Sequence, residues 1–220
     1  MKNFTDGAIS MQTLRRMPDY YNYLRGLQDK RAEYVSSVSI ARDMGLNEVQ
    51  VRKDLAAVSK TPGTPRKGFL TADLLESIGE YLGYHNRKDA LLVGAGQLGK
   101  ALLLYKGFEA HGMRIVTAFD SDAAVIGTSI GGKTVFPMDK LPSLRKRLGV
   151  RIGIITVPGP AAQAVCDVLV KTGISAIWNF APVHLKVPAE TSVQNENLAA
   201  SLALLSQQLD RDTTEGSRPS

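Results

Sequence analysis

Residues 90–99 read Ala-Leu-Leu-Val-Gly-Ala-Gly-Gln-Leu-Gly, an apolar run followed at once by three spaced glycines. Ala90–Val93 predicts a short buried strand, and the residues from Leu98 to Tyr105 predict the helix after it. In such a turn the first glycine allows a tight bend, and the second lets the backbone approach a pyrophosphate. The third lets helix and strand pack closely. The stretch Gly94, Ala95, Gly96, Gln97, Leu98 and Gly99 therefore predicts a dinucleotide-binding loop at a helix N-terminus.

An acidic residue at a suitable distance supports this prediction. Asp120 stands 21 residues after Gly99, at the end of a second predicted strand, Arg114–Phe119. A carboxylate there accepts hydrogen bonds from the adenosine ribose and repels a 2′-phosphate, so the sequence favours NAD(H) over NADP(H). The neighbouring Asp122 is interpreted as a solvated loop acid.

Strands and helices continue to alternate beyond this unit. Further strands are predicted at Arg151–Val157 and Ser175–Phe180, with a helix over Pro160–Thr172 between them. This alternation predicts a parallel α/β sheet with crossover helices. The helix after the glycines is expected to pack on it through Leu98, Ala101, Leu102 and Tyr105. A last helix is predicted over 196–209, and the polar residues 210–220 are expected to be disordered.

The N-terminal third has a different, helical pattern. Helices are predicted at Pro18–Leu27, Ser37–Met44 and Glu48–Ser59, the second ending at Gly45 and the third opened by an Asn47/Gln50 capping box. In the third helix Val51, Leu55 and Val58 form one apolar stripe, so Gln50, Arg52 and Lys53 must project outward. Two helices joined by a glycine turn are typical of a helix-turn-helix.

A basic, proline-containing segment follows, Lys60-Thr-Pro-Gly-Thr-Pro-Arg-Lys-Gly68, before another amphipathic helix at Thr71–Leu82. Because Pro62 and Pro65 exclude a helix, we interpret the segment as a wing that touches DNA. Residues 1–70 carry 12 basic and 7 acidic side chains, whereas the whole chain, with 27 and 21, has a net charge of +6. Basicity concentrated there indicates a polyanionic partner, the alternative being an ordinary solvated basic surface.

Length and composition exclude several other classes of protein. The 220 residues suffice for two small domains, and the 44% hydrophobic and 22% charged residues are typical of a globular protein. No apolar run is long enough to span a membrane, and the N-terminus lacks the apolar segment of a signal peptide, so a cytoplasmic location is expected. The single Cys166 excludes an internal disulfide and a cysteine-rich zinc site, and no metal site is expected.

Catalytic residues are harder to find. Hydride transfer to a carbonyl needs a proton donor beside the nicotinamide. Of the three histidines, His85, His111 and His184, the last alone follows a predicted strand end, and we interpret it as a structural or surface residue. Cys166 falls on a buried helix face and is expected to be core packing. No catalytic residue is therefore assigned.

The chain resembles the Rex family of redox-sensing transcriptional repressors over about residues 8–209. The resemblance rests on these segments: Arg16-Met-Pro18, Val35-Ser-Ser37, Gln50-Val-Arg-Lys-Asp-Leu55, Gly94–Gly99, Tyr105-Lys-Gly-Phe108, Phe119-Asp120, Thr156-Val-Pro158 and Asn179-Phe-Ala-Pro182. The Gln-Val-Arg-Lys-Asp-Leu and Asn-Phe-Ala-Pro segments are the most specific of them.

This resemblance implies a winged-helix DNA-binding domain over 1–84, a Rossmann NAD(H)-binding domain over 85–195 and a dimerisation helix over 196–209 swapped onto a partner chain. It also implies a homodimer on double-stranded operator DNA that NADH binding releases, so that the protein reads the ratio of NADH to NAD⁺.

The resemblance further implies roles for particular residues. Arg52 and Lys53 would reach bases and phosphates, with Ser36, Ser37, Gln50 and the wing residues Arg66 and Lys67 beside them. Tyr105, Pro158 and Asn179 would lie near the nicotinamide, and Thr156 and Val157 would also contact the cofactor. Arg16 and the start of the swapped helix would form the switch.

The chain departs from the family pattern in two places. The usual wing sequence Arg-Gly-Val-Gly-Tyr is Arg66-Lys-Gly-Phe69 here, which affects the operator sequence. The usual acid at the start of the swapped helix is Asn197, which affects redox discrimination. Two alternatives remain at this point: a small NAD-dependent oxidoreductase with an accessory helix-turn-helix domain, and an NAD-binding scaffold that does not bind DNA.

Overall fold

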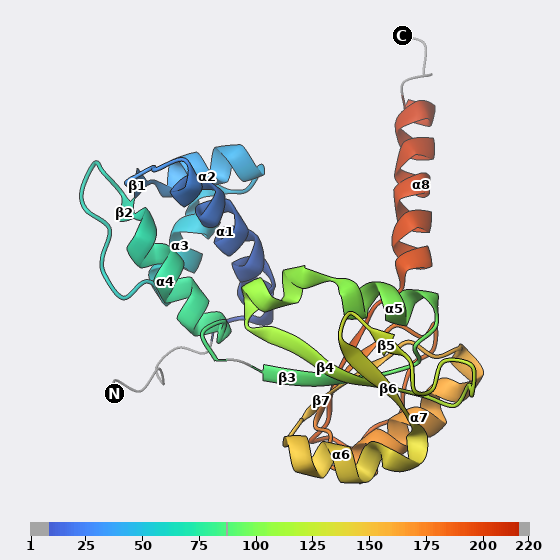
Figure 1. The fold of residues 1–220 in the computed structure, drawn as a ribbon. Helices are drawn as coiled ribbons and strands as arrows, with labels where there is room; N and C mark the ends of the chain where they lie inside the picture. Colours follow the sequence, from blue (N-terminus) through green and yellow to red (C-terminus); the bar gives the residue numbers. More distant parts are fainter. Residues whose placement is uncertain (1–8, 87, 216–220) are drawn as a thin grey trace. The chain divides into compact units, whose positions relative to one another are not determined.

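The computed structural model describes residues 9–86 and 88–215, with side chains described up to residue 207. The chain divides into two compact units between Asn86 and Arg87, two residues after the boundary expected from the sequence (Figure 1). The first unit is helical and the second contains a large sheet. None of the helices in the described part of the chain is long and apolar enough to cross a bilayer.

The first unit packs two further helices against the helix-turn-helix pair and has one short antiparallel strand pair. Its elements are α1 (Met11–Asp29), β1 (Tyr34–Val35), α2 (Ser37–Met44), α3 (Glu48–Val58), β2 (Phe69–Leu70) and α4 (Thr71–Leu82). Tyr34 pairs with Leu70 and Val35 with Phe69, so the two strands form the base of the wing. Every helix contributes to one core, through residues such as Tyr20, Ile40, Leu55 and Ile78.

The helix-turn-helix is confirmed in its ends and in its buried stripe. Ser36 forms a capping box with Ser39 at the start of α2, which ends at Gly45. Asn47 accepts a hydrogen bond from the Gln50 backbone N–H at the start of α3. Val51, Leu55 and Val58 are buried as predicted. The Gln50 side chain does not complete the predicted capping box, because it donates to Asp54 instead.

The first helix is longer than predicted and passes through Pro18. It begins at Met11, where the Ser10 hydroxyl accepts a hydrogen bond from the Thr13 backbone N–H. Burial of Met17, Tyr20 and Leu24 along one face outweighs the single backbone hydrogen bond that a proline removes. The expected start at Pro18 was therefore wrong.

A buried carboxylate joins α1 to α3. Asp54 is 2% exposed and receives hydrogen bonds from the Thr13 hydroxyl (3.0 Å), the Arg16 Nε (2.7 Å) and the second Arg16 nitrogen (3.0 Å). The Tyr20 hydroxyl (3.0 Å) and the Gln50 amide (2.9 Å) also donate to it. Burial alone would raise the pKa of Asp54, but these hydrogen bonds outweigh it and hold the pKa below its usual value.

The same environment affects Tyr20. Burial, and then its hydrogen bond to the Asp54 carboxylate, raise the pKa of Tyr20 to about 12. The phenol therefore stays protonated and donates to Asp54 across the physiological range. Because four side chains converge on one carboxylate, the position of α3 on α1 depends on Asp54.

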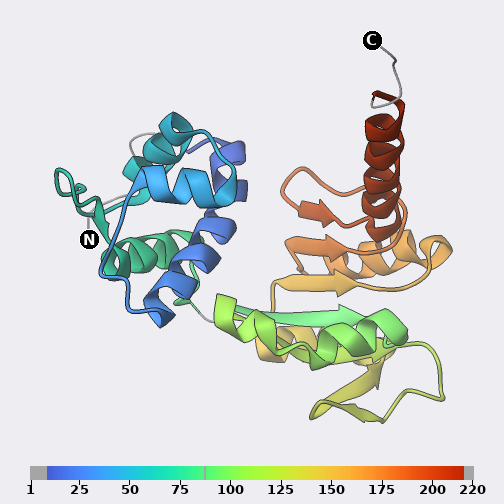
Figure 2. The ribbon, with the colours of Figure 1, turned by 90° about the horizontal axis from the view of Figure 1, so that it is seen from above.

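The second unit is built on one seven-stranded sheet with the order β5-β6-β4-β3-β7-β8-β9. Figure 2 shows the strands side by side, from olive β6 through green β3 to the orange β9. The elements are β3 (Lys88–Val93), α5 (Gln97–Leu104), the 3-10 helix η1 (Lys106–His111), β4 (Met113–Asp120), β5 (Ser129–Ile130), β6 (Lys133–Pro137), the 3-10 helix η2 (Met138–Lys140), α6 (Leu141–Leu148), β7 (Ile152–Ile155), α7 (Gly159–Lys171), β8 (Ala176–Asn179), β9 (Ser192–Asn195) and α8 (Leu198–Glu215).

Helices cover both faces of this sheet. Leu91 and Val93 of β3 pack in one core with α6 and α7, whereas Ala90 and Leu92 pack in the other with Leu103 of α5. Figure 1 shows α5 and α6 on opposite sides of the strands. Strands β6, β4, β3, β7, β8 and β9 run parallel, and β5 joins β6 antiparallel. The predicted parallel α/β sheet is confirmed; β5, β6, β9 and α6 were not predicted.

The predicted packing face of α5 was wrong for Ala101 and Tyr105, whereas Leu102 packs against the sheet core as predicted. The helix is anchored by Gly99 and Leu103, while Ala101 and Tyr105 are exposed and Leu98 and Leu102 are half-buried. The loop requires Gly99 to face the sheet, and that requirement sets the rotation of the whole helix. Leu104 and Tyr105 are consequently left on the surface, 58% and 61% exposed.

The C-terminal helix also differs from the prediction. It begins at Leu198, capped by Asn197, and continues to Glu215 rather than ending at residue 209. Residues 210–215 were expected to be disordered but are helical, because no glycine or proline interrupts the chain before Gly216. The remainder of the expected disordered tail, 216–220, lies outside the described residues.

Removing the Asp54 carboxylate tests its role. We expect Asp54→Ala to lower the free energy of unfolding by about 3–5 kcal/mol, because Arg16 loses its partner and three other donors lose their acceptor. Urea unfolding of the full chain, followed by circular dichroism, measures this loss.

The loss should also depend on pH. Because folding lowers the pKa of Asp54, its contribution is fully present above the unfolded value of about 3.9 and disappears as pH falls through the folded value. Asp43→Ala, which removes an exposed ion pair with Arg42 and an exposed hydrogen bond from the Tyr23 hydroxyl in the same unit, is the control and should change the midpoint far less. Equal stability of Asp54→Ala and the unmodified chain at neutral pH would contradict this account.

Candidate functional site

The glycine loop between β3 and α5 has the geometry that its sequence requires. Gly94 has a φ of +104°, a conformation that side chains rarely adopt. A Cβ on Gly99 would lie 1.9 Å from the Gly94 carbonyl oxygen, so helix and loop can approach only without a side chain there. A Cβ on Gly96 would meet nothing within 4 Å, which leaves open space above the loop backbone. A pyrophosphate fits such a space at the N-terminus of α5.

A cleft of about 500 Å³ opens at this loop. It lies at the carboxyl ends of β3, β4 and β7, the edge at which open parallel sheets bind ligands. Its lining residues are Val93, Gly94, Ala95, Gly96, Gln97, Lys100, Asp120, Ser121, Asp122, Val125, Met138, Thr156, Val157, Pro158, Ala161 and Val165. The cleft combines apolar walls with a few polar groups, which suits a nucleotide.

Asp120 connects the end of β4 to the glycine loop. Its Oδ2 accepts a hydrogen bond of 2.6 Å from the Ala95 backbone N–H. Its Oδ1 accepts from the backbone N–H groups of Ser121 (2.7 Å) and Asp122 (3.0 Å). Asp120 therefore stays at the cleft edge in a fixed orientation, while Asp122 accepts from Ala124 within its own turn.

The opposite wall of the cleft is fixed by Thr156. Its hydroxyl donates to the carbonyl oxygens of Gly94 (2.6 Å) and Val93 (3.1 Å), so the β7 end and the glycine loop hold each other in place. Pro158 caps the start of α7 directly beside it. Thr156, Val157 and Pro158 thus line the cleft together.

Four of the sequence-predicted cofactor residues do not line the cleft. Leu98 and Gly99 belong to the first turn of α5. Asn179 is fully buried, with its amide donating to the Ala181 and Val183 carbonyls and to Asn195. Tyr105 is exposed after α5. Lys100 does line the cleft and was not predicted, because a lysine in a helix carries no motif of its own.

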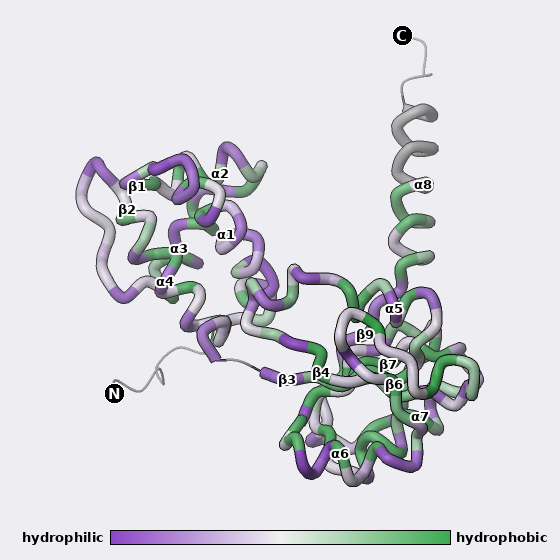
Figure 3. Tube along the Cα trace, viewed as in Figure 1, coloured by the Kyte–Doolittle hydropathy of each residue, from purple (hydrophilic) through white to green (hydrophobic). Residues whose placement is uncertain are grey.

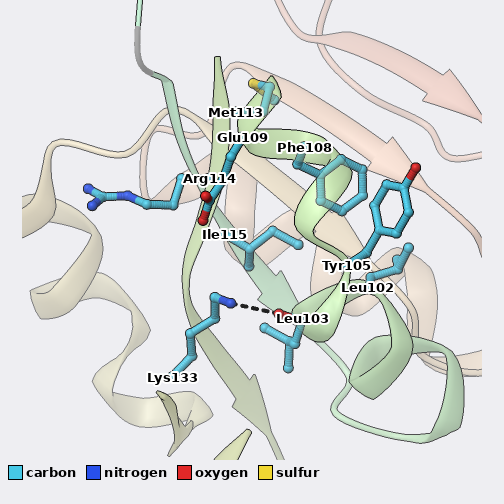
Figure 4. A pocket seen from close by; sticks show the side chains of 9 residues that line it. All are labelled: Leu102, Leu103, Tyr105, Phe108, Glu109, Met113, Arg114, Ile115 and Lys133. Carbon is cyan, nitrogen blue, oxygen red and sulfur yellow. Dashed lines mark hydrogen bonds between the residues drawn. The ribbon is translucent and has the colours of Figure 1, made fainter. Parts of the chain in front are cut away.

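Tyr105 belongs to a group of aromatic rings instead. Its ring packs edge-on against Phe108 at 4.9 Å, Phe108 packs against Trp178 at 5.7 Å, and Trp178 packs against Phe180 at 4.5 Å. The Trp178 indole also donates to Glu196, just before α8. Figure 4 shows Tyr105 and Phe108 beside a second pocket of about 10 Å³, room for one water, where Lys133 donates to the Leu103 carbonyl.

The outer surface of α3 carries the predicted DNA-contacting cations. Arg52 and Lys53 are exposed, and no hydrogen bond or ion pair among the described residues engages either side chain, so both are available to a ligand. Gln50 is also exposed but is held by Asp54 at 2.9 Å, which fixes the direction of its amide. Ser36 and Ser37 lie at the start of α2, where the Ser36 hydroxyl is occupied by its capping box.

The wing is a hydrogen-bonded turn on the strand pair. The Thr64 carbonyl accepts from the backbone N–H groups of Lys67 and Gly68, and Thr64 N–H donates to Gly68. At its base Lys60 forms an ion pair with Glu80. Arg66 is exposed at the turn with a φ of +65°, while the Lys67 ammonium lies 5.1 Å from the centre of the Tyr34 ring.

The two predicted switch residues have partners within their own units. Arg16 is bound to Asp54, and the Asn197 side chain accepts the Ala200 N–H as the cap of α8. Cys166 is buried in the sheet core, as expected, and burial raises the pKa of its thiol. Within residues 9–86 and 88–215, no three histidine, cysteine or acidic residues come together as a metal site.

Comparison with known proteins gives a separate family match for each of the two units. Residues 8–56 match a family described as putative DNA-binding protein N-terminus, and residues 85–183 match a CoA binding domain. The redox-sensing transcriptional repressor Rex of Treponema denticola is 40% identical over 193 residues, covering 88% of this chain and 91% of that protein. The Rex repressor of Carboxydothermus hydrogenoformans is 40% identical over 212 residues, covering 96% of this chain and all of that protein.

Solved structures give the same result. The crystal structure of RSP in complex with NAD⁺ and operator DNA superposes with a TM-score of 0.88 at 30% identity, covering 97% of this chain and all of that one. RSP in complex with NADH superposes with a TM-score of 0.85 at 30% identity, covering 96% of this chain and 99% of that one. With 40% identity to a curated repressor over 88% of its length, the chain belongs to the Rex family of redox-sensing transcriptional repressors.

Proposed function

We propose that this protein is a homodimeric transcriptional repressor that binds double-stranded operator DNA and is released from it when NADH binds. The observation that carries the proposal is the presence, in one chain, of a helix-turn-helix with two free cations and a sheet-edge cleft with a glycine loop and Asp120. Family relatives with this whole arrangement are repressors, and one is solved with NAD⁺ and operator DNA.

The cleft supports a dinucleotide as the signal. Gly94, Gly96 and the N-terminus of α5 would hold the pyrophosphate, Asp120 would accept the adenosine ribose hydroxyls, and Thr156, Val157 and Pro158 would lie toward the nicotinamide. The nicotinamide ring is the part that changes on reduction, since NAD⁺ carries a ring charge that NADH lacks. The signal must therefore be read at that end of the cleft.

Regulation is favoured over catalysis. Reduction of a carbonyl needs a positioned proton donor, yet the described residues that line the cleft include no histidine, tyrosine or cysteine. Lys100, the only lining cation among them, stands on α5 beside the glycine loop, on the phosphate side. His184 is exposed and outside the cleft. A repressor acts where the operator is, so we place the protein in the cytoplasm.

The switch is proposed to involve Arg16. Its side chain is 25% exposed while it binds Asp54, so a carboxylate or amide arriving from a swapped α8 would compete for a cation that already has a partner. Asn197 can offer such an amide only by weakening its cap on Ala200. A charged acceptor would compete about twice as strongly as this neutral one.

Selection of operators from random DNA, with and without NADH, tests the proposal as a whole. A defined sequence should be enriched without NADH and lost when NADH is added. Turnover of NADH with carbonyl substrates, together with no enriched DNA sequence, would support the oxidoreductase alternative instead.

Removing either recognition cation should weaken operator binding. We expect Arg52→Ala and Lys53→Ala each to lower operator affinity about tenfold to a hundredfold, as a lost base contact of about 1–3 kcal/mol does. NADH affinity should stay unchanged, since both residues belong to the other unit. Fluorescence anisotropy with labelled operator measures the effect, and Lys146→Ala, an exposed cation of α6, is the matched control. Unchanged affinity of Arg52→Ala would refute the assignment of α3.

Changing Asp120 should alter cofactor preference. Asp120→Ala should weaken NADH binding, both because the ribose acceptor is lost and because the Ala95 N–H loses its partner. Asp120→Arg should shift the preference toward NADPH. Titration by cofactor fluorescence measures both, with Asp167→Ala, an exposed acid of α7 that does not line the cleft, as the control. Equal affinity of the unmodified protein for NADH and NADPH would show that Asp120 is not the ribose acid.

The redox state of the ligand should govern release. We expect NADH to displace the protein from operator DNA at lower concentration than NAD⁺, with a modest difference because Asn197 is neutral. Asn197→Asp should widen that difference while keeping the cap of α8, since aspartate caps helices equally well. Gel shifts titrated with each nucleotide measure it. Equal release by NADH and NAD⁺ would exclude redox sensing in this chain.

A further inference from the structure

The outermost line of α3 begins with an apolar side chain. Because an α-helix turns by about 100° per residue, Val49, Lys53 and Ala56 fall along one line. That line lies opposite the buried stripe of Val51, Leu55 and Val58. Val49 is 47% exposed and contributes nothing to the core of the unit. It is the only large apolar residue exposed on this helix, among the residues that the structure describes.

Position and chemistry together limit what Val49 can meet. It is the second residue of α3, after the Asn47 cap, and recognition helices contact base edges with their N-terminal residues. Lys53, one turn further along the same line, is expected to reach the DNA. In the major groove the one apolar group on a base edge is the C5-methyl of thymine.

We propose that Val49 contacts the C5-methyl group of a thymine in the operator and so specifies that base. The inference rests on the proposed function and adds a base preference to it. A β-branched side chain has one strongly preferred rotamer in a helix, so Val49 presents its methyl groups in a fixed direction and loses little freedom on binding. Ala56, two turns further along the same line, is small and lets the outer face of α3 approach the groove.

The test is a double-mutant cycle between protein and DNA. Uracil differs from thymine only by lacking the C5-methyl, so each thymine of the selected operator is replaced by uracil in turn. Affinity is then measured for the unmodified protein and for Val49→Ala. We expect Val49→Ala to bind the operator about three- to tenfold more weakly. One thymine-to-uracil replacement per half-site should lower the operator affinity of the unmodified protein by a similar factor. The same replacement should not change the operator affinity of Val49→Ala.

Two controls separate recognition from folding. Val49→Ala should unfold at the same urea concentration or a higher one, because alanine favours an exposed helical position over valine. Val168→Ala, the same change at an exposed position of α7, should leave operator affinity and all uracil effects unchanged.

The possible results are distinct. The thymine contact would be overturned if each thymine-to-uracil replacement lowered operator affinity equally for the unmodified protein and for Val49→Ala. It would also be overturned if Val49→Ala kept full operator affinity. Either result would leave the repressor function intact. Failure of the unmodified protein to select any operator would instead overturn the proposed function, and this inference with it.

Discussion

The second unit depends on a contact that only glycine permits. Any side chain on Gly99 would collide with the carbonyl oxygen of Gly94, so α5 can begin directly above β3 only because position 99 has none. That contact sets the rotation of α5, places its N-terminus over open space at Gly96 and leaves Thr156 free to clamp the loop from β7. The cleft follows from this backbone packing more than from any polar side chain.

The first unit solves a similar problem with a buried charge. Helix α3 is short and has a narrow apolar stripe, so Asp54 supplies the directional contacts that apolar packing lacks. Directional bonds hold α3 at one angle to α1, whereas a purely apolar contact would tolerate slippage. The same carboxylate binds Arg16, so the positioning of the proposed DNA-reading surface and the proposed switch depend on one group.

Local spacing made much of this predictable. The order of strand, glycines, helix, strand and Asp120 is carried by neighbouring residues, and the structure has it; the stripe Val51, Leu55 and Val58 is likewise buried as predicted. The partners that Gln50 and Asn179 find lie elsewhere in the fold, and periodicity could not reveal them. The exposure of Ala101 and Tyr105 on α5 was not predicted, because loop geometry overrode hydrophobic spacing. Lys100 was missed because the sequence gives no sign of the cleft wall it joins.

The surface of α8 has a consequence for how such a protein responds to its own abundance. Leu198, Leu202, Leu204 and Leu205 are all more than half exposed, and the tube in Figure 3 shows green hydrophobic segments on the coloured part of this helix. An apolar surface of this kind is stable when a second chain covers it, so assembly follows mass action. On the proposed dimer, halving the amount of chain would lower the concentration of the DNA-binding species by more than half near the dissociation constant. Gene dosage would thereby become a second input beside the nucleotide ratio.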